Sequence, residues 1–123
     1  MPIWHIIYFP PSDGKDSPYE YIKGLSDKSE QAQITRRLKE LSERELVDWP
    51  SSWVHKVDDK ILQLTAHDHR IMFCIDQGEL VVLHACRKVK GKTHTRDLKR
   101  ACINYTAYFE KKQQDRDQKM VKS

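Results

Sequence analysis

Basic side chains gather in one short stretch of the sequence, and their spacing indicates what chemistry they could support. Asp97 is the only acid between Cys86 and Arg100. The residues of this stretch that could contact an anion are Arg87, Lys88, Lys90, Lys92, His94, Arg96 and Arg100. A dense group of one charge attracts ligands of the opposite charge, and nucleic acid is the best candidate for such a patch. The stretch predicts an RNA-binding surface; ordinary solvated lysines are the alternative.

RNA can be cleaved without a metal ion if the ribose 2′-hydroxyl attacks the adjacent phosphorus in line. The reaction needs a proton acceptor, a proton donor for the leaving oxygen, and cations around the developing charge. His84 and His94 can exchange protons near neutral pH. The residues that could hold the phosphate are Arg70, Lys88, Lys90 and Lys92. The stretch contains no pair of carboxylates, so two-metal nuclease chemistry has no support in it.

Arg70 is unusual because it interrupts an apolar run that continues through Ile71 to Ile75. A cation in a half-buried strand needs a partner, since burial without one is costly. The partner could be a carboxylate of the protein or a phosphate of a ligand. The sequence leaves both alternatives open.

Other kinds of site find little support. His67 and His69 could ligate a metal, but no third ligand follows from their spacing, so we predict no metal site and no cofactor. Cys74, Cys86 and Cys102 form no C-x-x-C pair, which favours reduced thiols in a cytoplasm. The chain has no apolar run of about 18 residues, and its first residues lack the features of a secretory signal. We therefore expect a cytoplasmic protein without a membrane span.

A β-hairpin is predicted just before the basic stretch. Two apolar runs, 69–75 and 79–85, are joined by Asp76-Gln77-Gly78, which is a typical turn sequence. Strict alternation would place Leu80, Val82 and His84 on one face of the second strand, and Val81, Leu83 and Ala85 on the other.

The remaining elements follow from hydrophobic periodicity. Upstream of the hairpin we expect a strand over 4–9, helices over 17–24 and from about 27 into the forties, and short strands over 53–57 and 61–64. A last helix is expected from about 95 to 112. The order predicts an α+β fold in which two N-terminal helices pack on a twisted, mainly antiparallel sheet of four to five strands, with a C-terminal helix. We expect one domain over 1–112 and a charged tail over 113–123.

The order of several short motifs resembles the RelE/HigB superfamily of toxins from type II toxin–antitoxin modules, and most closely its phage-derived HigB-like branch. The matching motifs are Ile6-Ile7-Tyr8, Ser17-Pro18-Tyr19-Glu20-Tyr21-Ile22, Ile61-Leu62-Gln63-Leu64, Arg70-Ile71-Met72-Phe73, Leu83-His84-Ala85-Cys86-x-Lys88 and Lys92-Thr93, followed by a helix through Leu98 and Ala101. The resemblance covers about residues 3 to 110.

The resemblance implies a RelE-like fold and a metal-independent endoribonuclease, an mRNA interferase that inhibits translation by cleaving mRNA on the ribosome. It also implies neutralisation by a cognate antitoxin, often a helix-turn-helix protein. By position, Arg70 would stabilise the transition-state phosphate, Lys88 and Lys92 would bind the RNA backbone, and His84 would transfer a proton. His94 is the alternative proton-transfer group.

The chain departs from the family pattern at several positions. Many members have Glu-Leu-Arg where this chain has Gln63-Leu64-Thr65, so one expected cation is missing. Paired lysines become Lys88-Val89, and His94 replaces a proline that is common before the last helix. Two other functions therefore stay open: a catalytically degenerate module that only binds RNA, a ribosome or an antitoxin, and a phage assembly protein.

Overall fold

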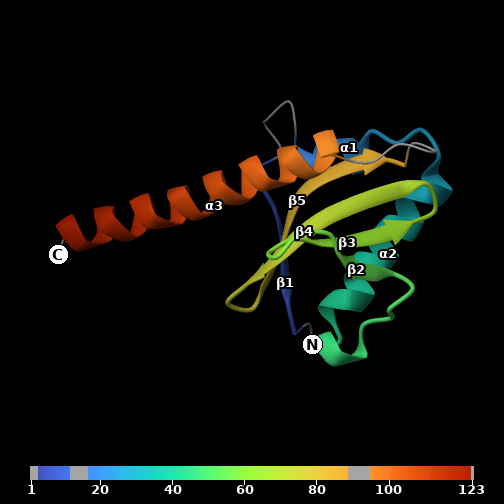
Figure 1. Ribbon diagram of the computed structural model, residues 1–123, viewed down its shortest axis with the longest axis horizontal. Helices are drawn as coiled ribbons and strands as arrows, with labels where there is room; N and C mark the ends of the chain where they lie inside the picture. The colour runs from blue at the N-terminus through green and yellow to red at the C-terminus, as the bar shows by residue number, and fades with distance from the viewer. Residues whose placement is uncertain (1–2, 12–16, 89–94, 123) are drawn as a thin grey trace.

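The computed structural model describes residues 3–11, 17–88 and 95–122, and it has the predicted α+β architecture. The elements, in chain order, are β1 (His5–Tyr8), α1 (Pro18–Lys23), α2 (Lys28–Ser42), a 3-10 turn η1 (Leu46–Asp48), β2 (Val54–Lys56), β3 (Leu62–Ala66), β4 (His69–Asp76), β5 (Glu79–Arg87) and α3 (Thr95–Lys122). This β-α-α-β-β-β-β-α order confirms the order expected from the sequence (Figure 1).

The strands form one five-stranded sheet in the order β1-β5-β4-β3-β2. β2, β3, β4 and β5 pair antiparallel with their neighbours, whereas β1 pairs parallel with β5 at one edge. The hairpin turn forms at the predicted place, with Gln77 and Gly78 both at positive φ. The prediction of a mainly antiparallel sheet is therefore confirmed.

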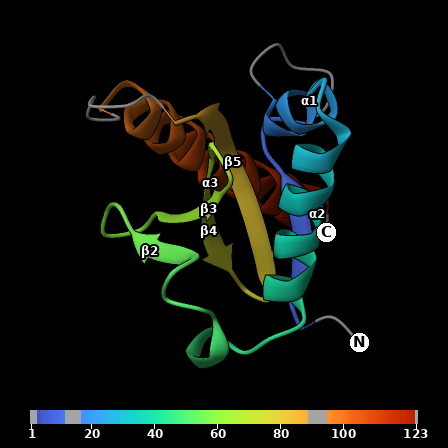
Figure 2. The same ribbon diagram turned by 90° about the vertical axis from the view of Figure 1, so that its right-hand side faces the viewer.

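Helices cover both faces of the sheet. α1 and α2 lie over one face, and α3 crosses the other (Figure 2). Each face has its own apolar cluster. The cluster under α1 and α2 includes Ile34, Leu38 and Leu41, the apolar stripe of α2, each 0–1% exposed. The cluster under α3 includes Met72, Val81, Leu83, Ala101 and Tyr108.

Phe73 lies at the centre of the larger cluster, where its side chain is fully buried and its ring meets Trp49 edge to face, with centroids 5.7 Å apart. We expect Phe73→Ala to lower the free energy of unfolding by about 3–5 kcal/mol, because a phenyl ring removed from a packed core leaves a cavity. Urea denaturation followed by circular dichroism measures this loss. Val47→Ala is the control: Val47 is 90% exposed, and its loss should change stability by less than about 0.5 kcal/mol.

A β-bulge changes the faces that alternation predicts for β5. Phe73 pairs with Val82 and Met72 pairs with His84, so Leu83 has no partner on β4. Beyond the bulge, Ala85 joins the α1/α2 face, while His84 lies on the α3 face with Leu83. The prediction that His84 shares a face with Leu80 and Val82 is wrong, because an extra residue on one strand resets the alternation.

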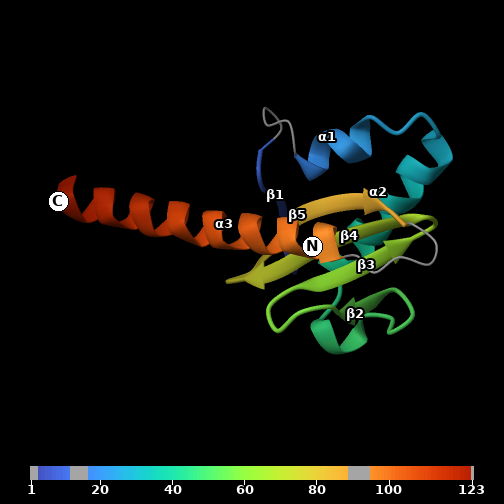
Figure 3. The same cartoon turned by 45° about the horizontal axis from the view of Figure 1, so that its top comes forward.

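α3 is longer than the sequence predicts. It continues to Lys122, ten residues past the expected end at Lys112, and it extends well beyond the sheet (Figures 1 and 3). Near its middle, the Tyr108 hydroxyl donates to carboxylates of Asp76 and Glu79, and the Lys112 ammonium pairs with Asp76. These bonds attach α3 to the turn between β4 and β5. Among the described residues, no helix is long and apolar enough to cross a membrane.

Candidate functional site

Polar side chains collect on the α3 face of the sheet, beside the first turn of α3. Thr65 on β3, Arg70 on β4 and Cys86 on β5 are register partners across three adjacent strands. The neighbours of Thr65 along β3, Leu64 and Ala66, belong to the α1/α2 cluster, so alternation turns Thr65 and its partners to the other face. The bulge adds His84 to this row, which we call the polar face.

His84 is held by an acid from α3. Its Nε2 lies 2.8 Å from Oδ1 of Asp97, which stands in the first turn of the helix. Both side chains are mostly buried, with 16% and 28% of their surface exposed. The carboxylate accepts the hydrogen bond, so Nε2 carries the proton and Nδ1 keeps a lone pair. An imidazole oriented in this way presents the Nδ1 lone pair as a proton acceptor.

Arg70 is half-buried between β3 and β5. Among the residues that the structure describes, none forms a hydrogen bond or an ion pair with its guanidinium. Of the two alternatives that the sequence left open, a carboxylate partner is therefore not found in this part of the chain. A planar guanidinium without a protein partner is well suited to a phosphate, which it can hold through two parallel hydrogen bonds.

Cys86 lies next to both groups but is not a nucleophile at neutral pH. Burial raises the pKa of its thiol to about 12, and the charge of Asp97 and a hydrogen bond to it act in the same direction, while the Arg70 guanidinium opposes them. Since the thiolate is the reactive form of cysteine, this thiol stays inert under physiological conditions. His84 is therefore the candidate proton-transfer group of the polar face, and Cys86 is not.

The raised pKa makes stability depend on alkaline pH. The folded thiol titrates near 12, above the ordinary value of 9.0, so its contribution is complete below pH 9 and is lost as the pH rises towards 12. We expect the free energy of unfolding in urea to fall between pH 8 and pH 10.5, and to fall less in Cys86→Ala. An equal loss of unfolding free energy in the wild type and in Cys86→Ala would contradict a raised pKa of the Cys86 thiol.

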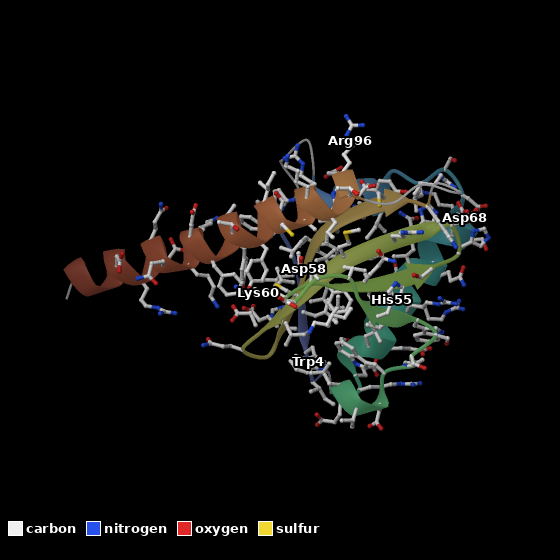
Figure 4. All side chains as sticks on the ribbon, viewed as in Figure 1. Trp4, His55, Asp58, Lys60, Asp68 and Arg96 are labelled. Atoms are coloured by element: carbon white, nitrogen blue, oxygen red, sulfur yellow. The ribbon has the colours of Figure 1, made fainter. Side chains whose placement is uncertain are left out.

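A shallow cavity of about 300 Å³ adjoins the His84–Asp97 pair. The other residues lining it come from α3 and are Arg96, Lys99, Arg100 and Ile103. Figure 4 shows Arg96 pointing outward from the first turn of the helix, away from the sheet. The structure thus brings two of the predicted RNA-binding residues, Arg96 and Arg100, next to His84.

Other predicted residues lie elsewhere. Arg87 follows Ala85 on the α1/α2 face, where its Nη2 is 4.0 Å from Oε2 of Glu30, so the sheet separates it from Arg70. Lys88 is exposed just after β5, and its backbone N–H donates to the carbonyl of Asp68. Lys90, Lys92 and His94 lie outside the described residues.

Asp97, Lys99 and Cys86 also belong to this site, although the sequence did not predict them. Asp97 carried a usable signal, because it is the single acid in a basic stretch and stands where a helix begins. Arg96, Lys99 and Arg100 have the spacing i, i+3, i+4, so their side chains share the exposed side of one helical turn. Cys86 carried no signal beyond its place two residues after His84.

Two groups of described residues have metal-ligating atoms within 4.8 Å of one another. One is His84, Cys86 and Asp97, in which His84 and Cys86 each already bond to Asp97, beside the Arg70 cation. The other is Glu30, His67 and Asp68, at the β3–β4 turn and the start of α2. It lies at the same end of the strands as the polar face, on the side of the sheet that α1 and α2 cover.

The sequence profile of the phage-derived Gp49-like proteins (DUF891) matches residues 20–106, which is most of the chain. A comparison with curated proteins gives no significant match.

Proposed function

Because the chain belongs to the phage-derived Gp49-like protein family, we propose that it is the toxin of a type II toxin–antitoxin module and inhibits translation by cleaving mRNA on the ribosome. The family match spans the motifs from Ile61 to Ala101 on which the resemblance to RelE/HigB toxins rests. One observation carries the catalytic part of the proposal. The guanidinium of Arg70, which has no hydrogen-bond or ion-pair partner within residues 3–11, 17–88 and 95–122, and the oriented imidazole of His84 lie on the same face of the sheet.

The proposed reaction uses these two groups in distinct roles. Asp97 holds the Nε2–H of His84, so Nδ1 can take the proton of the ribose 2′-hydroxyl. The oxygen then attacks the adjacent phosphorus, and Arg70 stabilises the negative charge that develops on the phosphoryl oxygens. The 5′-oxygen leaves with a proton, giving a 2′,3′-cyclic phosphate and a 5′-hydroxyl. We propose His94, which the sequence offers as the alternative proton-transfer group, as the donor of that proton.

The basic residues of α3 would hold the RNA on either side of the scissile bond. Arg96, Lys99 and Arg100 surround the cavity beside His84 and are exposed. Their contacts with phosphates release counterions, so binding of RNA or ribosomes should weaken steeply with salt. The ribosome, mRNA and a cognate antitoxin are the proposed partners.

Expression of the chain in cells without an antitoxin tests the proposal. Growth should stop, and mapping of RNA 5′ ends should show new ends inside translated codons, carrying a 5′-hydroxyl. Co-expression of the small open reading frame next to the gene should restore growth. Intact messages in arrested cells would contradict cleavage, and normal growth with intact messages would contradict the toxin itself.

A second function is favoured by Thr65. Thr65 is the register partner of Arg70, and it replaces the arginine that many RelE/HigB proteins have there. A member with one cation fewer at the phosphate could bind RNA, a ribosome or an antitoxin without cleavage. This binding module would bind ribosomes with the same salt dependence but leave messages intact, so the mapping of 5′ ends separates the two functions.

A further inference from the structure

β1 is an edge strand of the sheet, and its outer side is open. The backbone N–H groups of His5 and Phe9 donate to carbonyls of the β4–β5 hairpin. Because alternate residues of a strand turn their backbone groups to opposite sides, the N–H and C=O groups of Ile6 and Tyr8 point away from β5. Among the residues that the structure describes, no strand pairs with β1 on this side. An open edge of this kind is a template for pairing with another extended segment.

A groove follows this edge between β1 and α2, which lie beside each other in Figure 2. It consists of two cavities of about 530 Å³ and 540 Å³, and Lys39 lines both. The first cavity lies at the start of β1, where Trp4 donates its backbone N–H to the carbonyl of Ser42 at the end of α2. The second extends past Tyr8 towards the start of α2. We call the two cavities together the edge groove.

The second cavity of the edge groove is basic. Its charged lining residues are Lys23, Lys28, Arg36 and Lys39. All four are exposed, no acid is among the described residues that line this cavity, and within the described part of the chain none of the four forms an ion pair. Glu40, one turn after Arg36, pairs with Arg44 instead. A group of cations without neutralising acids attracts a ligand of negative charge.

The walls of the edge groove favour a peptide over RNA and over a second copy of this chain. The apolar residues that line the first cavity are Ile3, Trp4 and Ile6. The Tyr19 ring has the Lys23 ammonium 5.3 Å above it and meets the Tyr8 ring edge to face, so it offers little free surface for stacking a base. A second copy of the chain would bring its own four cations against these.

We propose that the edge groove binds an extended, acidic segment of a partner protein, which pairs with β1 as a further strand of the sheet. Backbone bonds to Ile6 and Tyr8 hold the segment, an apolar side chain fills the first cavity, and alternate acidic side chains face the cations. The cations from Lys28 to Lys39 span about 16 Å of α2 at about 1.5 Å per residue, which is the length of about five residues of a strand. Arg70 and His84 lie on the other face of the sheet, so this site is separate from the proposed cleavage and does not depend on it.

An NMR titration of the isotope-labelled full chain tests the proposal. The probe is the acetylated and amidated peptide Leu-Val-Glu-Val-Glu-Val-Glu, in which strand alternation puts the leucine and the glutamates on one side. The peptide should bind, and it should slow the exchange of the Ile6 and Tyr8 amide hydrogens with solvent, because these N–H groups then donate to its backbone. The same peptide with lysine in place of each glutamate should not bind, since the cations of the groove repel it.

A charge-reversed variant gives the second test. Arg36→Glu combined with Lys39→Glu should weaken binding of the acidic peptide by at least about tenfold and should allow the lysine peptide to bind, because attraction and repulsion change places. Lys56→Glu combined with Lys111→Glu is the matched control. It changes the net charge equally at two exposed positions outside the groove, and it should bind the acidic peptide within about twofold of the wild type, as expected for rim charges remote from a contact.

A short uridine oligonucleotide tests the alternative occupant. It should leave the exchange of the Ile6 and Tyr8 amide hydrogens unchanged, since it cannot pair with a strand edge. If the acidic peptide leaves these two amides unprotected, or does not bind, the proposal is wrong. Equal weakening of peptide binding in the control variant would also overturn it. If the oligonucleotide shifts the resonances of Arg36 and Lys39 and the peptide does not, the edge groove is a nucleic-acid site instead.

Discussion

Arg70→Ala is expected to abolish growth arrest and to lower the rate of mRNA cleavage by about 10²–10³-fold, the usual effect of removing one donor that stabilises developing charge. The loss should be mainly in kcat, because a phosphate gains negative charge only as the reaction proceeds. Arg70→Lys should recover part of the rate, since a lysine keeps the charge but cannot form two parallel bonds. Cleavage in a reconstituted translation system, followed by primer extension, measures each rate.

The matched control is Arg87→Ala, because Arg87 lies one register pair away but on the opposite face of the sheet. We expect this variant to cleave within about twofold of the wild type, a change too small to register as loss of an interaction in the transition state. Both variants should unfold at a similar urea concentration, since neither side chain belongs to an apolar cluster. Full activity in Arg70→Ala would remove this residue from the mechanism.

The second large effect is expected for the His84–Asp97 pair. His84→Ala should lower cleavage by about 10²–10⁴-fold, the range that a positioned general base contributes. Asp97→Asn should have a smaller effect, because the imidazole remains present but loses the group that holds its Nε2–H. Cleavage in the reconstituted translation system measures both rates.

The double variant gives the sharper test. If Asp97 acts through His84, Asp97→Asn should not lower the cleavage rate further in the His84→Ala protein. The effects of substituting residues that work as one unit are not additive. Ile103→Ala is a control from the same cavity. Because the Ile103 side chain has no polar atom, its truncation should leave the rate of cleavage close to that of the wild type. Additive losses would mean that Asp97 contacts the RNA by itself, and an active His84→Ala would move proton transfer to another group.

The fold could be predicted because apolar residues recur with different periods in its helices and its strands. The i, i+4, i+7 spacing of Ile34, Leu38 and Leu41 matches a helix that buries one side, and all three are buried. The turn at Asp76-Gln77-Gly78 is explicit in the sequence and forms as expected. The end of α3 could not be placed, because the residues after Lys112 are polar on all sides and lack the apolar stripe on which such predictions rest.

The site was predicted less completely than the fold. Arg70 and His84 were chosen by residue type, and the structure places both on the polar face. Their common face, however, depends on the bulge at Leu83, and a bulge arises from the pairing of two strands and not from the pattern of one. For the same reason, the sequence could not show that Arg87 lies with Glu30 on the other side of the sheet.

The bonds of Tyr108 and Lys112 to Asp76 and Glu79 attach the middle of α3 to the β4–β5 turn, between Asp97 in its first turn and its protruding end. Force applied to the protruding turns would be delivered to the hairpin at Asp76, several helical turns before it reached Asp97. A tether, fluorophore or fusion partner attached beyond Lys112 should therefore leave the geometry around His84 undisturbed. The end of α3 after Lys112 is therefore a suitable attachment site for immobilising this protein on a surface while its binding to ribosomes is observed.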